Sequence, residues 1–406
     1  MQGSTVGGAI QGTTEPQFAQ VAEAFGALAS EVGRGGAAFC ATVRGQVVVD
    51  LWCGQADAER PWASDTAASL FSATKGMTAA CIALLHDRGQ LDVDLPVARY
   101  WPAFAAEGKG GLTVRQVLSH TCGLTEVPGY RDLMGLDGSG HADHGEIRRR
   151  LAAATPQWEP GTAVGYHVMT YGYLAGTILE LVDGRPLGQF FEEELREPLD
   201  LEVGIGASDG ELARKSVALE PDPLPDDDLG AAFGALLAAA RDETTLIGRA
   251  CIAQGGEGIL DRLAELGNTP PMLRAGVGSG DGVGTARGLA TFYGHLVDPD
   301  GNDAVPGSET LRSLTRIELA GPDAILGVPN AFGVGFGRTF AVAHAGPSAA
   351  TFGHGGAGGQ VGFGDPEREV GVGFTRSHLS HTSALAAQLV TALYEAMGPV
   401  TDPRTA

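Results

Sequence analysis

The sequence predicts a mixed α/β fold in which a sheet built from both ends of the chain carries an inserted, mostly helical lobe. Two strand-like runs, Ala37–Val43 and Gln46–Trp52, meet at Arg44-Gly45 as a hairpin does. The middle of the chain keeps its apolar residues at helical spacing. Short strand-like runs return near the C-terminus, before a helix predicted over Ser383–Met397. This order of strands, helices and strands indicates one sheet whose parts are distant in the sequence.

Apolar spacing and capping residues define the elements of the first half. Residues 1–14 are expected to form a loose arm, and a helix is predicted over Glu15–Val32. Thr113 offers an N-cap for a helix over Val114–His120. The Gly- and Asp-rich segment 132–143 is expected to be a loop. Further helices are predicted over 145–154, 170–182 and 186–195.

The second half begins with a Pro- and acid-rich segment, 220–228, which is expected to be an exposed linker. The apolar run Leu229–Ala240 is predicted to be a core helix. Two more helices are expected over 286–297 and 308–317, and strands over 332–337, 350–354, 360–364 and 370–375. We therefore expect residues 1–70 and 285–406 to form the α/β lobe, residues 71–284 to form the helical lobe, and the active site to lie between them.

Composition indicates a globular protein and excludes several kinds of partner. The chain has 406 residues and a net charge of −22, and its longest basic cluster is Arg148-Arg149-Arg150. This charge argues against nucleic acid and against anionic membranes as partners. No secretory signal is evident, and Leu229–Ala240 has about half the length that a membrane span needs.

The cysteines and histidines indicate a cytoplasmic protein without a metal. Five cysteines are scattered without C-x-x-C spacing, so reduced, packed side chains are expected. His141-x-x-His144, at the end of the Gly- and Asp-rich region, has no evident third ligand, which favours a surface loop. No metal and no other cofactor is predicted.

Ser72-Ala73-Thr74-Lys75 is the first candidate for chemistry. Residues three apart lie on one face of a helix, so the Ser72 hydroxyl and the Lys75 amine can meet. The apolar residues that follow Lys75 keep helical spacing and predict a buried helix. Burial favours a neutral amine, which can take the proton of the hydroxyl and activate it as a nucleophile. The alternative is a capping serine and a lysine whose stem covers apolar surface.

Tyr166 and His167 form the second candidate group. A turn-rich segment leads to Tyr166, and a predicted helix follows from Thr170, so the phenol can point into a cleft. The alternative for Tyr166 is an aromatic side chain that fills the interior with its hydroxyl hydrogen-bonded. For His167 the alternative is exposed surface.

The third candidate is the glycine-dense segment Thr351–Gly359. Its glycines permit a ligand to approach the backbone closely. One backbone N–H of this segment and that of Ser72 can form an oxyanion hole. The alternative is a mobile turn.

Two further patterns are weaker. Gly206–Gly210 fits G-x-S-x-G, but a nucleophile elbow needs a buried strand, a helix and partner residues, and a polar stretch follows here. Ser208 is therefore not expected to be catalytic. Cys122, beside His120, is a candidate reactive thiol, although packing is the favoured interpretation.

With these segments in hand, the chain resembles the serine β-lactamase and penicillin-binding-protein superfamily, in particular the class C β-lactamase-like branch that includes the family VIII esterases. Ser72-Ala73-Thr74-Lys75 corresponds to S-x-x-K, Tyr166-His167-Val168 to Y-x-N, and His354-Gly355-Gly356 to the K-T-G strand. The likeness runs from about 37 to 201 and returns near 332–375. It implies a β-lactamase/transpeptidase-like fold, with an antiparallel sheet flanked by helices.

The resemblance also implies roles for the site residues. Ser72 is the nucleophile, and Lys75 is the base or the partner of the base. Tyr166 is the general base or acid, with a pKa that Lys75 lowers. The backbone N–H groups of Ser72 and Ala357 hold the oxyanion. His167, together with His354, Gly355 and Gly356, is expected to contact substrate.

The departures from the family pattern favour ester chemistry. Val168 replaces the Asn of Y-x-N, and His354-Gly355 replaces the Lys-Thr of K-T-G. The missing groups normally bind the carboxylate and the side-chain amide of a β-lactam. Their loss weakens lactam recognition and leaves attack on a neutral ester intact, and family VIII esterases show similar substitutions.

The leading hypothesis is a cytoplasmic serine esterase that works through an acyl-Ser72 intermediate. The first alternative is a transacylase that passes the acyl group from a small-molecule donor to an amine or alcohol of a secondary metabolite. A β-lactamase or D-amino-acid peptidase ranks lower, and a non-catalytic binding protein ranks lowest. The expected partners are small molecules, and the oligomeric state is left open.

Overall fold

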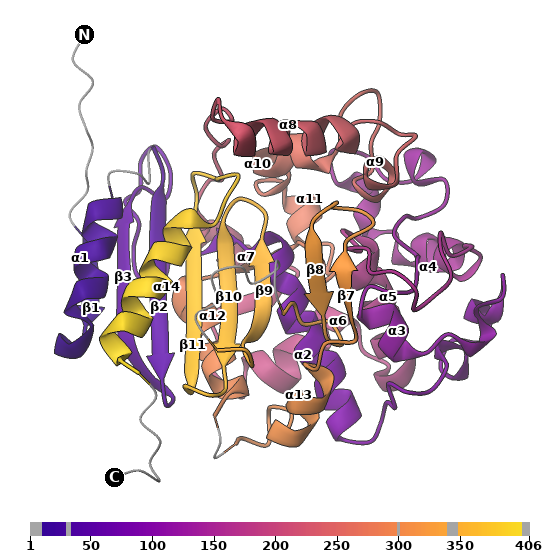
Figure 1. The fold of residues 1–406 in the computed structure, drawn as a ribbon, viewed down its shortest axis with the longest axis horizontal. Helices are drawn as coiled ribbons and strands as arrows, with labels where there is room; N and C mark the ends of the chain where they lie inside the picture. The colour runs from indigo at the N-terminus through magenta and orange to yellow at the C-terminus, as the bar shows by residue number, and fades with distance from the viewer. Residues whose placement is uncertain (1–9, 30–33, 299–300, 339–347, 400–406) are drawn as a thin grey trace.

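The main sheet joins strands from both ends of the chain. The computed structural model describes residues 10–29, 34–298, 301–338 and 348–399. Six antiparallel strands lie in the order β1-β3-β2-β11-β10-β9 (Figure 1). They are β1 (Gln11–Thr14), β2 (Gly36–Val43), β3 (Gln46–Gly54), β9 (Phe352–Gly356), β10 (Gln360–Asp365) and β11 (Val370–Arg376). The predicted antiparallel sheet of the β-lactamase/transpeptidase-like fold is therefore confirmed.

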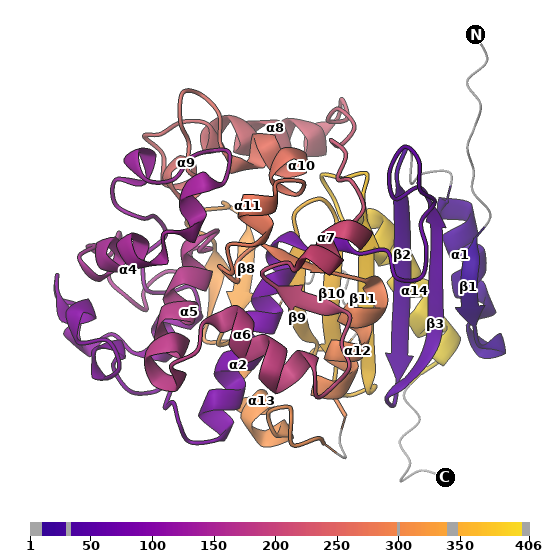
Figure 2. The same cartoon turned by 180° about the vertical axis from the view of Figure 1, so that it is seen from behind.

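Helices cover both faces of this sheet. Helices α1 (Ala19–Leu28) and α14 (Ala384–Met397) lie on one face, and α12 (Ala286–Leu296) lies on the other (Figures 1 and 2). In β11, valines and a phenylalanine pack toward α1 and α14, while the alternating glycines face α12. A Cβ on Gly373 would lie 2.0 Å from the Ala286 carbonyl oxygen. The alternation of large residues with glycine thus allows α12 to lie directly against the sheet.

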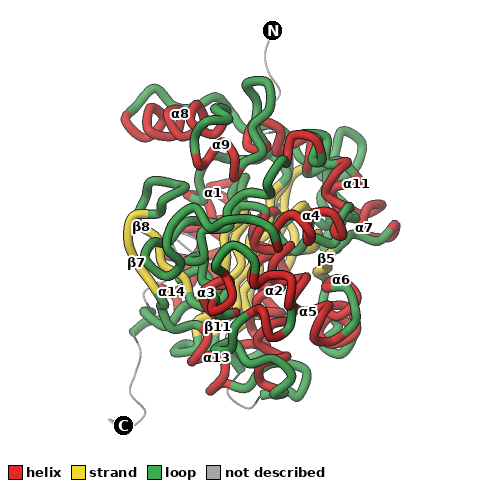
Figure 3. Tube along the Cα trace, turned by 90° about the vertical axis from the view of Figure 1, so that its right-hand side faces the viewer, coloured by secondary structure: helices red, strands yellow, loops and turns green. Residues whose placement is uncertain are grey.

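The helical lobe is built around α2 (Thr74–Asp87), which is buried from Thr74 to Leu85. Figure 3 shows the helices of this lobe in front of the sheet. The apolar cluster that contains Met77 of α2 also contains Phe292 of α12 and Phe352 of β9, so one core runs through both lobes. The other helices, apart from α8, are α3 (Val114–Leu118), α4 (His144–Ala152), α5 (Thr170–Asp183), α6 (Leu187–Phe191), α7 (Asp209–Arg214), α9 (Leu246–Ala250), α10 (Leu263–Leu266), α11 (Pro270–Leu273) and α13 (Ser308–Leu314).

Several local predictions are confirmed. Thr113 caps α3 in a capping box with Gln116. The predicted N-terminal hairpin forms as β2 and β3, and α4, α5, α6, α12, α13 and α14 lie where helices were expected. The predicted helix over Glu15–Val32 is a 3-10 turn at Pro16–Phe18 followed by α1, and residues 30–33 lie outside the described residues.

The expectation of a loose arm over residues 1–14 is wrong for its last part. Gln11–Thr14 forms β1, which pairs with β3 at the edge of the sheet. Its side chains are mostly exposed, so the segment has no apolar alternation that could have indicated a strand. Residues 1–9 lie outside the described residues.

Helix α8 (Asp228–Ala240) is not the core helix that its composition suggested. Leu229 is 60% exposed, and Gly230 and Ala240 are the buried residues of the helix. Phe233 lies against His381, with ring centroids 5.1 Å apart. Apolar content misled here because alanine and glycine bury little area, and small apolar residues are common on protein surfaces.

The strand predicted over 332–337 is also wrong. The chain forms β7 (Leu319–Pro322) and β8 (Pro329–Phe332) as an antiparallel pair and then turns. The turn includes Gly335 at φ +83°, where a Cβ would lie 2.2 Å from the Tyr171 hydroxyl. A small sheet of β4 (Ala68–Ser69), β6 (Gly282–Gly284) and β5 (Val203–Ile205) was not predicted, because its strands are only two or three residues long.

The 132–143 region is more ordered than a surface loop. It contains a 3-10 turn at Ser139–Ala142, and His141 is fully buried, with its Nδ1 2.6 Å from the Tyr173 hydroxyl. In the described part of the chain, no three His, Cys, Asp or Glu side chains form a group that could hold a metal. Nor does any described helix combine the length and apolar character needed to cross a bilayer.

Candidate active site

Ser72 lies in a 3-10 turn, Phe71–Ala73, directly before α2. Phe71 has a φ of +46°, a left-handed conformation that is unfavourable for a bulky residue. The Thr74 hydroxyl fixes this turn because it donates to the Phe71 carbonyl at 2.5 Å and accepts from the Gly282 N–H at 3.0 Å. The strained turn leaves the Ser72 side chain half-buried at the start of the helix.

The Lys75 amine is held by three oxygen atoms. Its Nζ lies 3.2 Å from Ser72 Oγ, 2.8 Å from the Val168 carbonyl oxygen and 2.7 Å from the Ser279 carbonyl oxygen. Carbonyl oxygens can only accept hydrogen bonds. A neutral amine therefore gives its two hydrogens to the carbonyls and directs its lone pair at the Ser72 hydroxyl. The fixed carbonyls make Ser72 the proton donor whenever Lys75 is neutral.

Burial makes the neutral form of Lys75 accessible. The side chain has no exposed area, and desolvation lowers the pKa of Lys75 to about 7. The buried Asp281 partly opposes this shift and raises the pKa. A substantial fraction of Lys75 is therefore neutral near pH 7, as a base for Ser72 requires.

Tyr166 reaches the same site from the loop before α5. The Ser72 side chain acts on the phenol of Tyr166 and favours a lower pKa, and Lys75 Nζ lies 5.0 Å from the centre of the Tyr166 ring. Burial raises the pKa of Tyr166 well above 10, and the Ser72 side chain only partly offsets this. The expectation that Lys75 lowers this pKa is wrong, because desolvation dominates. Tyr166 is therefore a protonated phenol that can donate a proton.

The glycine-rich edge strand lies beside the nucleophile. A Cβ on Gly356 would lie 2.2 Å from the Leu70 carbonyl oxygen and 3.3 Å from the Ala73 nitrogen, so β9 and the Ser72 turn are in close contact. Within the described chain, the Ala357 N–H has no backbone carbonyl as partner. This arrangement is compatible with an oxyanion hole formed by the Ser72 and Ala357 N–H groups, which stays a prediction.

His354 and His167 differ from what was expected of substrate-binding residues. Desolvation lowers the pKa of His354 to about 3, so this ring is neutral beside Tyr166, with centroids 5.8 Å apart. His167 is fully buried, with Nδ1 2.7 Å from the Gly165 carbonyl and Nε2 3.1 Å from Cys122 Sγ. Because both of its ring nitrogens have partners in the interior, the expectation that His167 contacts substrate is wrong.

The two weaker patterns have structural roles. Ser208 caps α7 in a capping box with Glu211 and has no place in the Ser72 site. Cys122 is buried, and desolvation raises the pKa of its thiol to about 12. A thiol that stays protonated is a poor nucleophile, so the packing interpretation holds for Cys122.

Three positions that sequence reasoning missed complete the site. The Ser279 carbonyl binds Lys75, and the Ser279 hydroxyl links the Met169 carbonyl to the Gly172 N–H. Asp281 holds the loop of residues 274–281, here called the Ser279 loop, by accepting from two of its backbone N–H groups. Asp323 accepts the backbone N–H of Tyr166 at 3.0 Å. The only signals for these residues were polar side chains among glycines or in a turn, which are common in loops.

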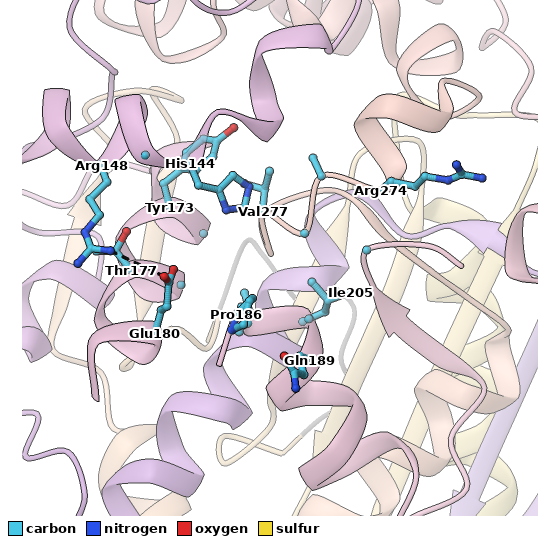
Figure 4. A pocket seen from close by; sticks show the side chains of 18 of the residues that line it. His144, Arg148, Tyr173, Thr177, Glu180, Pro186, Gln189, Ile205, Arg274 and Val277 are labelled. Atoms are coloured by element: carbon cyan, nitrogen blue, oxygen red, sulfur yellow. Dashed lines mark ion pairs between the residues drawn. The ribbon is translucent and has the colours of Figure 1, made fainter. Parts of the chain in front are cut away.

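A separate cavity of about 500 Å³ is lined in part by residues 274–277, which precede Ser279 in the chain (Figure 4). Side chains of α4, α5 and α6 line it, among them His144, Arg148, Thr177 and Glu180. Neither Ser72 nor Lys75 nor Tyr166 lines this cavity. This cavity is therefore distinct from the Ser72 site.

The chain is similar to known proteins in both sequence and fold. A model of the family described as Beta-lactamase matches residues 18–395. The chain is 35% identical over 386 residues to esterase/beta-lactamase LipL of Mycobacterium tuberculosis, which covers 93% of this chain and 84% of that protein.

Two solved structures superimpose over nearly the whole chain. A family VIII carboxylesterase has 31% identity and a TM-score of 0.81, over 96% of this chain and 100% of its own. A penicillin-binding protein homologue from Caulobacter crescentus has 33% identity and a TM-score of 0.79, with the same coverage.

The Lys75 geometry predicts an acid limb in the pH profile. Neutral Lys75 is the basic form, so its population rises with pH through the pKa of about 7. We expect kcat/KM for an ester to rise tenfold per pH unit below about pH 7 and to level off above it. Lys75→Arg, which stays charged, is expected to remove activity at every pH. A profile flat from pH 5 to 8, or an active Lys75→Arg enzyme, would contradict this assignment.

Two glycines one turn apart on α5 test the Ser279 loop. A Cβ on Gly172 would lie 2.1 Å from the Val277 carbonyl oxygen, whereas a Cβ on Gly176 meets Leu187 at an ordinary 3.7 Å. We expect Gly172→Ala to displace the loop, to cost about 1–3 kcal/mol of stability and to lower kcat at least about tenfold. Gly176→Ala is expected to add about 0.5–1 kcal/mol of stability and to leave kcat unchanged. Thermal melts and kcat measure both, and equal behaviour of the two variants would refute the proposed dependence of Lys75 on this loop.

Proposed function

The chain belongs to the beta-lactamase family, and we propose that it is a serine hydrolase that cleaves carboxylic esters through an acyl-enzyme on Ser72. The observation that carries the proposal is the Lys75 amine, whose lone pair faces the Ser72 hydroxyl 3.2 Å away. The two carbonyls that accept hydrogen bonds from this amine leave its remaining direction facing the Ser72 hydroxyl. The names of the esterase relatives support the same class of reaction.

In the first half-reaction Lys75 takes the proton of Ser72 Oγ while Oγ forms a bond to the ester carbonyl carbon. The carbonyl oxygen becomes an oxyanion, which the backbone N–H groups of Ser72 and Ala357 stabilise. When the intermediate collapses, the C–O bond to the leaving group breaks and the alkoxide takes the phenol proton of Tyr166. The Lys75 ammonium then returns its proton to Tyr166, so an alcohol leaves and the acyl-enzyme remains.

The second half-reaction repeats these steps with another nucleophile. Water attacks the acyl carbonyl carbon, loses one proton through Tyr166 to Lys75, and releases the acid as Ser72 Oγ regains its proton. An amine or alcohol that reaches the same position instead of water gives acyl transfer. Hydrolysis and transfer therefore share every residue named here, and the transacylase alternative differs only in its acceptor.

The groups around Tyr166 favour an ester over a β-lactam. His354 stands where the family pattern has a lysine, and burial keeps its ring neutral. Gly355 offers no hydroxyl, and Val168 offers only its carbonyl, which already binds Lys75. A substrate carboxylate finds no cation among these residues, whereas a neutral ester needs none.

The setting of the enzyme is part of the proposal. The five cysteines are unpaired and buried, which supports a reducing compartment such as the cytoplasm. The net charge of −22 supports small molecules as partners in preference to nucleic acid or anionic membranes. A role in secondary metabolism accompanies the transacylase alternative.

Two serines provide a matched test of the nucleophile. Ser72→Ala is expected to lower kcat for p-nitrophenyl butyrate by about a thousandfold or more and to abolish the mass increment left by a fluorophosphonate. Ser208→Ala removes the other candidate hydroxyl; it is expected to cost about 1 kcal/mol of stability through the lost helix cap and to keep full activity. A fluorophosphonate adduct that persists in Ser72→Ala would refute the proposed nucleophile.

A substrate panel ranks the competing activities. We expect short p-nitrophenyl esters to be hydrolysed with a kcat/KM at least about a hundredfold above that for nitrocefin, because no cation binds the lactam carboxylate. Product analysis with added amines measures amide against free acid, and free acid is expected to dominate. Nitrocefin turnover that rivals the esters would favour a β-lactamase, and an excess of amide would favour the transacylase.

A further inference from the structure

We propose that Asp323, in the connection between β7 and β8, is a positioning residue that sets the Tyr166 phenol against Ser72. This inference rests on the proposed function, since it concerns the proton donor of that reaction. It gives the β7–β8 hairpin, which lies more than 150 residues beyond Tyr166 in the chain, the role of positioning a reacting side chain.

Tyr166 depends on other parts of the protein for its position because of the segment in which it lies. The segment from Ala163 to Val168 has no helical or strand hydrogen bonds of its own and precedes α5. A loop of this kind does not fix a side chain unless other parts of the protein hold it. The position of the phenol must therefore come from outside the segment.

Asp323 supplies the contact at Tyr166 itself. Its side chain is buried and accepts the Tyr166 N–H at 3.0 Å with Oδ1 and at 3.1 Å with Oδ2. The same side chain accepts from the backbone N–H groups of Ile325 and Leu326 and from the Asn330 amide. All of these partners are donors, as an ionised carboxylate requires, so Asp323 ties the loop of Tyr166 rigidly to the hairpin.

The hairpin holds the segment at two further points. The Ala324 N–H donates to the Val164 carbonyl at 2.9 Å, which fixes the chain two residues before Tyr166. The Phe332 ring of β8 stacks on the Tyr166 ring with centroids 5.9 Å apart and planes within 10°. Backbone and ring are thus held by the same hairpin, which leaves the phenol little freedom to turn away from Ser72.

The charge of Asp323 also suits a proton donor. A buried carboxylate near a phenol disfavours the phenolate, and Asp323 contributes to the raised pKa of Tyr166. The hairpin therefore holds the phenol in place and helps to keep its proton on it until a leaving group takes it.

A double-mutant cycle tests the proposal. Asp323→Asn keeps the size of the side chain but replaces one acceptor oxygen with a donor. On p-nitrophenyl butyrate, we expect it to lower kcat about 10- to 100-fold and to change KM less than about threefold, because a displaced phenol affects the transition state more than binding. In a Tyr166→Phe enzyme, where no phenol is left to position, the same change is expected to alter the residual kcat less than about twofold.

Two further variants complete the test. Phe332→Leu removes the ring partner of Tyr166. It is expected to lower kcat in the parent enzyme and to have little effect on kcat in the Tyr166→Phe enzyme. If Asp323→Asn does not fold, Phe332→Leu tests the proposal in its place. Asp143→Asn makes the same chemical change at the carboxylate that caps α4, and it is expected to leave kcat unaltered.

The outcomes separate the inference from the proposed function. If Asp323→Asn, or Phe332→Leu in its place, lowers kcat by one factor in both backgrounds or not at all, the positioning role is wrong while Ser72-dependent hydrolysis stands. If the parent enzyme shows no Ser72-dependent ester hydrolysis, the proposed function itself fails.

Discussion

The site depends on one buried amine with three oxygen neighbours. Lys75 has no access to water, and two of its neighbours are carbonyls that must receive hydrogens. Desolvation favours the loss of its third proton, and the remaining direction of the amine faces Ser72. Helix α2, the Ser279 loop and the segment before α5 all serve to keep this arrangement dry and fixed.

Tyr166 and His354 complement the Lys75 amine in the site. A base with a pKa near 7 needs a second group that can return a proton to the leaving oxygen, and the buried phenol of Tyr166 remains protonated for this purpose. His354, which stands where the family pattern has a lysine, is neutral. Burial therefore acts on both residues, because it makes Lys75 a base and keeps the charge off His354.

Much of the fold and the pairing of Ser72 with Lys75 could be predicted from the sequence because the relevant signals are local. Ser72 and Lys75 are one helical turn apart, Thr113 and Gln116 form a capping box, and β10 and β11 near the C-terminus alternate large residues with glycine. The pairing of Ser72 with Tyr166 came from family resemblance, since 94 residues separate them. The polar edge strand β1 and the alanine-rich α8 were misjudged because the composition of each segment does not indicate how exposed it is or what it pairs with.

The groups that hold the catalytic residues were beyond sequence reasoning for a physical reason. Ser279 and Asp323 act through hydrogen bonds to main-chain atoms of distant segments, and such bonds leave no pattern in the residues they join. The sequence identified a phenol and an amine that the structure brings together at Ser72, but it did not identify the backbone atoms that orient them.

The most direct test of the account is the ionisation of Lys75 itself. The chain has three lysines, so NMR of protein labelled at lysine Cε and Nζ gives three resolvable signals, and Lys75→Arg identifies one of them. The account predicts that the Lys75 signal titrates with a pKa of about 7 in the free enzyme. A value above about 9, close to that of an ordinary lysine, would contradict the central claim that Lys75 serves as the base.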